Sequence, residues 1–541
     1  MKKSFLGLKT FELIGLVVGL LGFIFFITAP FAGLTLAGHL ALAIFWLAAW
    51  FYISQPIPVY ATSLLVMLLA SLLLSAEGPI YKSAKQEFTP VAKDSTGSFI
   101  ISKSALIDGK YVYKYDGKHW ETIVVNPEIV SETKIKITSD ELQNGDQVGI
   151  NLTKVTAGYS PLSYKTIFGT LANPIIILFL GGFMLAQAAV KYRLDAALTA
   201  YLLRPFGNKP PYILFGLILV TAILSAFMSN TATTAMMMTV ILPIIAVIPS
   251  NDKFKSAVVL SIPIAANIGG IATPIGTPPN AIVIAALAQQ KIGLAFSDWV
   301  IMALPYTIAM LAIAWFLLRV LYKPTIKTVD LNLKAKFNKE PKAIALYVIF
   351  FVTVMLWFTE SLHGIPSGLT AFIPLTFLTF GKILDTNDIR SLSWEVLWLV
   401  SGGMALGMII DKTGLALWLL QSIEWSNFSI LFLFFTFAIV GWALANFMSH
   451  TVTATLLMPL GISLGLSGSL GSGYSTVLTC MVIGISSSLA MILPISTPPN
   501  AIAMATNMIK TKDMAVFGLI IGLIGIPLMI AFAWFYWNLF V

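Results

Sequence analysis

The stretches FMSNT at residues 227–231 and TPPNAI at residues 277–282 return as FMSHT at 447–451 and TPPNAI at 497–502. Both words recur at the same interval of 220 residues (449 − 229 and 497 − 277). Each word interrupts an apolar segment with Ser, Asn, Thr, His or Pro. Two copies of a unit that breaks membrane segments in this way are typical of secondary transporters, which place the breaks around a site near the middle of the bilayer.

The composition indicates an integral membrane protein. Of the 541 residues, 57% are hydrophobic and only 11% are charged, and the mean hydropathy is +0.88. Apolar runs such as 11–30, 33–54 and 515–541 reach the length that a spanning helix needs. The sequence therefore predicts an all-α polytopic membrane protein with about 11 transmembrane helices, two re-entrant hairpins and broken helices.

The net charge of +9 is explained by sidedness rather than by nucleic-acid binding. The positive-inside rule assigns the basic clusters to the cytoplasm. These clusters are Lys2, Lys3 and Lys9; Lys191, Arg193, Arg204 and Lys209; Lys253 and Lys255; Arg319 through Lys342; and Lys510 and Lys512. Counting spans from an inside N-terminus predicts a plasma-membrane protein with an extracellular C-terminus, and gives the two motif copies opposite orientations. This is an inverted repeat.

The expected organisation has four parts. They are N-terminal transmembrane helices at 1–76; an extracellular β-rich insertion at 77–160; a first repeat at 161–325, with a cytoplasmic-side hairpin at 210–250 and a broken helix at 256–290; and a second repeat at 326–541, with an outside hairpin at 427–470 and a broken helix at 473–507. Alternating runs such as 111–115 predict the strands of the insertion. Both a ligand-binding insertion and a passive one remain open. The lone Cys480 gives no metal pattern, and no cofactor is expected.

The broken helices indicate the chemistry of the site. Free N–H groups at the start of a half-helix favour an anion, and prolines that interrupt a helix free carbonyl groups for a cation. Neutral Asn and Thr donors permit release of the substrate as well as its binding. The alternative interpretation is that these hydroxyls only bond to their own backbone and the prolines only kink a span.

At these residues the chain resembles the divalent anion/sodium symporter family, also called dicarboxylate transporters. The resemblance covers the membrane part and implies a homodimer, an elevator-like transport portion and C4 to C6 substrates such as succinate, malate, fumarate or 2-oxoglutarate. It implies that substrate contacts Ser229, Asn230, Thr231, Ser449, His450, Thr451, Thr497 and Pro498. It also implies a sodium site, possible in the first half only, at Ser225, Ser229, Asn230 and Gly276.

The second half departs from the family pattern. His450 replaces the Asn of the word, and Ala445 stands where the first half has Ser225. We therefore expect the second sodium site to be lost. An imidazolium at 450 could balance a dianion, whereas a neutral ring would only form hydrogen bonds. Within the family this resembles the exchanger branch, typified by 2-oxoglutarate/malate translocators; the alternative is sodium-coupled symport.

Two other functions fit the sequence less well. The pattern GISLG at 461–465 resembles the nucleophile elbow of a serine hydrolase, with His450 nearby in sequence. That reading leaves the repeat unexplained and offers no acidic partner. A channel would require a ring-forming charge motif, which the sequence does not show. The sequence thus predicts a carrier and not an enzyme.

Overall fold

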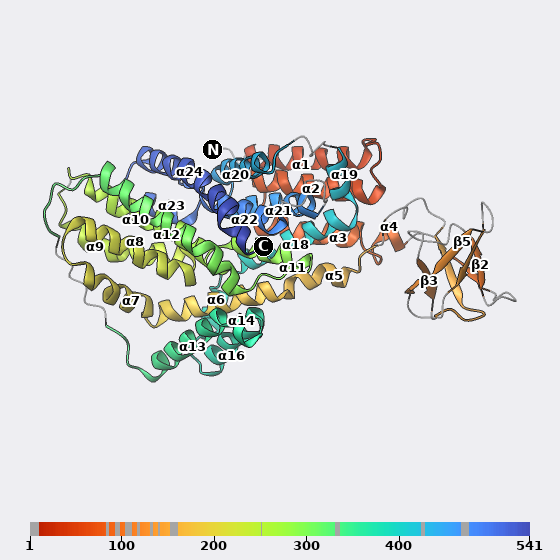
Figure 1. Ribbon diagram of the computed structural model, residues 1–541, viewed down its shortest axis with the longest axis horizontal. Coiled ribbons are helices and arrows are strands. Elements are labelled where there is room, and N and C mark those ends of the chain that lie inside the picture. The colour runs from red at the N-terminus through yellow and green to blue at the C-terminus, as the bar shows by residue number, and fades with distance from the viewer. Residues whose placement is uncertain are drawn as a thin grey trace.

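The computed structural model describes residues 10–82, 86–91, 98–102, 111–115, 120–129, 134–138, 141–151, 159, 161–249, 251–329, 336–422, 428–466 and 475–541. Within these ranges nine helices are long and apolar enough to cross a membrane, and shorter apolar helices accompany them. The chain is therefore a mostly helical, polytopic membrane protein, as predicted (Figure 1). Residues 427 and 470, the two predicted limits of the second hairpin, lie outside the described residues, as does residue 473 at the start of its broken helix.

The N-terminal helices form a separate packing group joined by α18. They are α1 (Thr10–Thr28), α2 (Leu36–Ser54), α3 (Val59–Leu73) and the short α4 (Pro79–Lys82). Trp50 Nε1 on α2 donates to the Gly15 carbonyl of α1 at 2.9 Å. The Gly15 position allows this close approach because a Cβ there would lie 2.9 Å from Ser54. This group shares a hydrophobic core with α18.

The first unit begins with a long helix that is interrupted once. The elements are α5 (Tyr164–Gly169), η4 (Thr170–Ala172), α6 (Pro174–Lys191), α7 (Leu194–Leu203), η5 (Arg204–Phe206), α8 (Pro210–Phe227), α9 (Asn230–Ala246), α10 (Phe254–Gly269), η6 (Gly270–Ala272), α11 (Pro278–Gln289) and α12 (Phe296–Leu321). Pro occupies the first turn of α6, α8 and α11, where its missing N–H costs nothing.

The second unit repeats the succession that starts at α8 in the first unit. Between the units lie α13 (Pro341–Phe358), α14 (Glu360–His363), α15 (Ser367–Thr370), α16 (Phe372–Phe380), α17 (Thr386–Arg390), α18 (Trp394–Lys412) and α19 (Leu415–Gln421). The second unit itself is α20 (Ile430–Phe447), α21 (His450–Leu466), α22 (Thr476–Ser488), α23 (Pro498–Ala505), α24 (Thr511–Phe535) and η8 (Trp537–Leu539). In both units a pair of helices is followed by a helix that stops and restarts at Pro-Pro.

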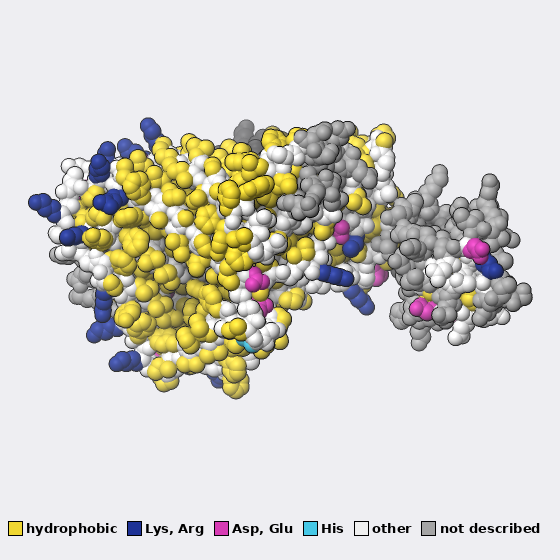
Figure 2. All heavy atoms as spheres, viewed as in Figure 1, with side chains coloured by type: hydrophobic (Ala, Val, Ile, Leu, Met, Phe, Trp, Pro, Cys, Tyr) yellow, Lys and Arg dark blue, Asp and Glu magenta, His cyan; other side chains and the backbone are white. Residues whose placement is uncertain are grey.

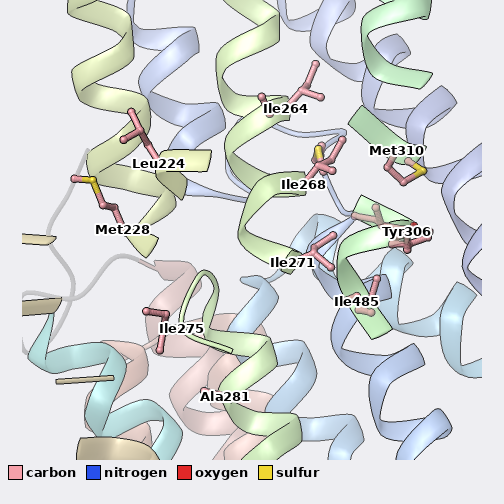
Figure 3. Packing of buried hydrophobic residues seen from close by; sticks show 14 of the residues in the cluster. Leu224, Met228, Ile264, Ile268, Ile271, Ile275, Ala281, Tyr306, Met310 and Ile485 are labelled. Atoms are coloured by element: carbon pink, nitrogen blue, oxygen red, sulfur yellow. The ribbon is translucent and has the colours of Figure 1, made fainter. Parts of the chain in front are cut away.

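Each helix pair packs against both broken helices. In the first unit, α9 contacts α10 and also α23 of the second unit. In the second unit, α21 contacts α22 and also α11 of the first unit. The apolar packing that holds the first break includes Leu224 on α8, Met228 just after α8, and Ile268 on α10 (Figure 3). The two units therefore interlock rather than lying side by side as independent bundles.

The insertion consists of two small antiparallel sheets. The strands are β1 (Gln86–Pro90), β2 (Phe99–Ser102), β3 (Tyr111–Tyr115), β4 (Trp120–Val124), β5 (Asn126–Ile129), β6 (Lys134–Thr138) and β7 (Gln147–Asn151). One sheet has the order β1-β7-β3-β4 and the other β2-β6-β5. Phe99, Val112, Ile123 and Ile137 are buried in a small core. At the base of the insertion, the Glu77 carboxylate accepts hydrogen bonds from Ser163 Oγ at 3.0 Å and Tyr164 N at 3.1 Å.

The surface of the helical part matches a membrane protein. Large apolar side chains are widely exposed, and Figure 2 shows them covering most of the visible face. In the same view Lys and Arg gather mainly at the end of the molecule around α9 and α10, away from the strands. At a helix end, Lys191 pairs with Asp385 at 2.9 Å and with Asp388 at 2.5 Å.

Candidate functional site

Each of the two FMS motifs ends in a serine that caps the following helix. Ser229 caps α9, its hydroxyl accepting from Ala232 N at 3.1 Å. Ser449 does the same for α21, accepting from Val452 N at 3.2 Å. Because a cap satisfies only part of the first turn, other N–H groups of the turn remain available to an anion. The hydroxyls of Ser229 and Ser449 therefore shape the two helix starts.

The Asn of each TPPN word holds an unwound segment open. Asn280 Nδ2 donates to the carbonyl groups of Gly270, Ile271 and Thr273 at 3.0, 3.3 and 2.8 Å. Asn500 Nδ2 donates to the carbonyl groups of Met491 and Leu493 at 3.2 and 3.1 Å. Positions 271 and 491, and 273 and 493, correspond at the interval of 220 residues. Sequence reasoning did not assign these Asn residues, although the repeated word contained the signal.

Three of the four predicted cation-site residues come together in the first half. Ser225 Oγ lies 2.6 Å from Asn230 Oδ1 and donates to the Ala266 carbonyl at 2.9 Å. With the Asn230 amide turned over, its nitrogen instead donates to the carbonyls of Gly276 at 3.0 Å and Ala266 at 3.2 Å. In the first orientation the group contains two side-chain and two backbone oxygens, the donor set that a hard cation prefers; in the second orientation the amide nitrogen replaces Asn230 Oδ1. The fourth residue, Ser229, caps α9 instead.

Glycine is required where this group is tightest. A Cβ at Gly276 would collide with the Gly270 carbonyl, and a Cβ at Gly270 would lie 2.6 Å from Asn230 Oδ1. Both positions therefore let the break approach the tip of the α8–α9 pair.

In the second half a histidine joins the tip of the α20–α21 pair to the break between α22 and α23. His450 is only 7% exposed, and its Nε2 lies 2.7 Å from the Ala490 carbonyl. Because a carbonyl oxygen can only accept, Nε2 carries the proton of this bond. Ala445 is fully buried beside the tip and offers no hydroxyl. A protein N–H therefore occupies the region where the first half gathers its oxygens.

A second tie between tip and break has changed its position within the turn. In the first half, the Thr273 hydroxyl donates to the Ala226 carbonyl and accepts from Gly276 N at 3.1 Å. In the second half, the Ser496 hydroxyl donates to the Asn446 carbonyl at 3.0 Å and accepts from Leu493 N at 3.3 Å. Carbonyls 226 and 446 correspond, but 273 corresponds to 493 and 276 to 496. The hydroxyl has moved from the first to the fourth position of the turn, so sequence comparison missed it.

The other predicted substrate residues differ in exposure. Thr231 is exposed, and Pro498 is exposed at the start of α23. Thr451 is 9% and Thr497 4% exposed. Ser229 lines a small hollow of about 60 Å³ together with Gln187 of α6 and residues 391–393. The α9 start is therefore the more accessible of the two helix starts.

The geometry rules against a serine hydrolase at GISLG. The motif lies within α21 and not on a strand-to-helix turn. Ser463 Oγ donates to the Pro459 carbonyl at 2.7 Å. Ser463 and His450 lie on the same helix about 20 Å apart along its axis, too far for a nucleophile and its base.

The comparisons with known proteins agree with a transporter. A family model described as a citrate transporter matches residues 149–474, more than half of the chain. An uncharacterised transporter of Haemophilus influenzae is 30% identical over 400 residues, which cover 70% of this chain and 84% of that protein. The sodium-dependent dicarboxylate transporter SdcS of Staphylococcus saprophyticus is 31% identical over 416 residues, or 69% of this chain and 78% of that protein. The solved YdaH transporter of Alcanivorax borkumensis covers 77% of this chain and 93% of its own, with 12% identity and a TM-score of 0.48.

A polytopic helical fold and relatives that are transporters define the class as a membrane transporter. The chain belongs to the citrate transporter family, and the predicted resemblance to divalent anion/sodium symporters is confirmed by its dicarboxylate-transporter relatives.

Proposed function

We propose that this protein exchanges C4 to C6 dicarboxylates such as succinate, malate, fumarate and 2-oxoglutarate across the plasma membrane without coupling to sodium. The observation that carries the proposal is the bond from His450 Nε2 to the Ala490 carbonyl at 2.7 Å. This side-chain N–H joins the tip directly to the break. No cation is therefore needed between these two segments. Loss of the hydroxyl at Ala445 points the same way.

In this proposal the substrate carboxylates bind at the starts of α9 and α21. Asn230 and Thr231 hold one carboxylate; Thr451, Thr497 and Pro498 lie on the other side, with His450 facing the same end of α21. Free N–H groups of the two helix starts add partial positive charge. Neutral donors give moderate affinity, which exchange requires because each substrate must also leave.

Alternation between the two faces follows an elevator mechanism in this proposal, within an inverted repeat and a homodimer. The N-terminus is cytoplasmic and the C-terminus extracellular. The unequal exposure of Thr231 and Thr451 supports a conformation in which the α9 start is accessible from one side and the α21 start is covered. The hollow that Ser229 lines also contains Val190, next to Lys191 of a basic cluster, so in this proposal the accessible side is cytoplasmic by the positive-inside rule.

Sodium-coupled symport is the second candidate. Its support is the oxygen group of Ser225, Asn230, Ala266 and Gly276 together with the relatives named as sodium-dependent. In that case sodium would be a co-transported substrate held in the first half alone.

One experiment separates the two. Purified protein is reconstituted into vesicles, and uptake of labelled succinate is measured with and without internal dicarboxylate, each with and without an inward sodium gradient. Exchange requires internal dicarboxylate and is insensitive to sodium. Uptake into empty vesicles driven by sodium would establish symport instead.

A further inference from the structure

An apolar hollow of about 380 Å³ lies between the end of α7 and the second half of α8. Tyr201 and Phe206 line it from the α7 side, and Leu219 and Ile223 line it from α8. Tyr201 is 61% and Ile223 41% exposed, so the hollow opens to the outside of the helical part. Because α8 begins at Pro210 and is a candidate span, the hollow lies along a helix that faces the bilayer.

One charged residue stands in this otherwise apolar lining. Arg204 belongs to η5, the turn between α7 and α8, and is exposed. Among the described residues none forms an ion pair with it. A guanidinium at the rim of an apolar groove has an unmet preference for a planar or tetrahedral oxyanion, which it can hold with two parallel hydrogen bonds.

Aromatic residues continue from the hollow to Arg319 of α12. Phe206 packs edge-on against Phe215, and Phe215 packs edge-on against Trp315, with centroid distances of 5.7 and 5.6 Å. The Arg319 guanidinium lies 5.5 Å from the centre of the Trp315 ring. Trp and Tyr beside Arg are typical of the level of the lipid headgroups.

We propose that the hollow between α7 and α8 binds one anionic phospholipid. An acyl chain lies along Leu219 and Ile223, and the phosphate is held by Arg204. The charge of Arg204 matches the phosphate, and the apolar lining matches an acyl chain. The site is separate from the substrate residues and goes beyond the proposed exchange function.

The test is native mass spectrometry of the full-length protein in detergent, titrated with phosphatidylglycerol or with phosphatidylcholine. The wild type should retain one phosphatidylglycerol more tightly than phosphatidylcholine. Arg204→Gln should weaken phosphatidylglycerol about fivefold or more, because one basic residue near the surface contributes about 1 kcal/mol. Arg204→Lys should keep most of the preference. The exposed Lys327, which does not line the hollow, gives the matched control Lys327→Gln, with no change expected.

A groove-filling variant tests the apolar half of the site. Ile223→Trp should weaken both lipids and leave the charge of Arg204 in place, and it carries the test together with Arg204→Lys if Arg204→Gln does not fold. Equal retention of phosphatidylglycerol by the wild type, Arg204→Gln and Ile223→Trp would overturn the proposal. So would displacement of the lipid by millimolar inorganic phosphate, which would indicate a free-anion site.

Discussion

Asn267 of α10 donates its side-chain amide to Thr497 Oγ1 and to Asn500 Oδ1, both at 3.3 Å. The first broken helix is thereby tied to the second at the start of α23. The tie is one-sided, because the corresponding position in the second unit is Ser487, whose hydroxyl donates to the Ile483 carbonyl of its own helix at 2.7 Å. Asn280 Oδ1, the counterpart of the Asn500 acceptor, is accordingly buried without a hydrogen-bond partner among the described residues.

Replacing Asn267 should therefore cost more than replacing its counterpart. Asn267→Ala removes two buried hydrogen bonds and leaves Asn500 Oδ1 unpaired, at a cost of about 1 to 3 kcal/mol. We expect a lower midpoint of thermal unfolding in detergent and slower exchange. Ser487→Ala is the matched control and should be nearly neutral, since it removes only a bond within one helix. Equal shifts in the two variants would show that the tie between the broken helices is unimportant.

The close approach of break and tip makes Gly276 a sensitive position. Gly276→Ala places a methyl group against the Gly270 carbonyl, a backbone atom that cannot move aside. Overpacking of this kind costs about 1 to 3 kcal/mol and should displace the Asn230 amide, so substrate exchange should be lost. Gly293→Ala serves as the control because open space surrounds that position. Retained exchange in Gly276→Ala would argue against a functional role for the oxygen group.

The proposed substrate residues can be tested by removing neutral donors. Asn230→Ala, Thr231→Ala and Thr497→Ala should each weaken succinate binding by about 1 to 3 kcal/mol, roughly five- to a hundredfold. Half-saturation for succinate in vesicle exchange is the measurement. Ser463→Ala should be mild, because its hydroxyl only bonds to the Pro459 carbonyl one turn back. Loss of function in Ser463→Ala with normal Asn230→Ala would mean that the substrate site is misplaced.

Asp252 outside the membrane spans should make stability depend on acid pH. Burial alone would raise the pKa of this carboxyl, but hydrogen bonds from Thr325, Phe254 and Ile326 hold it below its ordinary value of 3.8. A depressed pKa stabilises the folded protein above the unfolded-state pKa, and this contribution is lost as the pH falls through the folded-state pKa. The temperature at the midpoint of unfolding of the wild type should therefore decrease once the pH is below about 4.

Asp252→Asn should lower the free energy of unfolding by about 1 to 3 kcal/mol already at neutral pH. Its unfolding midpoint should therefore be lower at neutral pH and should fall less steeply at acid pH. Asp411→Asn is the control, because the Asp411 carboxylate is 38% exposed and, among the described residues, forms an ion pair only with its neighbour Lys412 at 3.2 Å. A wild-type acid profile preserved in Asp252→Asn would assign the effect to other carboxyls.

The helix breaks could be predicted from the sequence because their signals are local. Ser before the first turn predicts a cap, and Pro-Pro predicts a helix start, as α9, α11, α21 and α23 show. Strands 111–115 and 134–138 follow likewise from alternation. Both kinds of signal lie within about ten residues of the structure they determine.

The ties between segments could not be predicted, because they depend on which segments meet. The contact of Asn267 with Thr497 joins residues 230 positions apart. The exchange of roles between Thr273 and Ser496 preserves a carbonyl contact while moving the hydroxyl three positions along the chain. Alignment of the two repeats compares position with position, and so it misses a function that has changed position.

The last prediction concerns His450. If a protonated ring balances a dianion, the proton and the substrate must each strengthen binding of the other. Succinate affinity should then fall from about pH 5.5 to 8.5, after correction for the second ionisation of succinate, which acts in the opposite direction at the acid end. His450→Asn should flatten this dependence. His39→Asn is the control, because the His39 ring bonds to the Phe26 carbonyl in the N-terminal helices.

Adding Ala445→Thr to His450→Asn rebuilds the oxygen-bearing pattern of the first half and should introduce a response to sodium. A pH profile unchanged in His450→Asn would leave the ring as a neutral donor to Ala490, and the exchange proposal would then rest on that hydrogen bond alone.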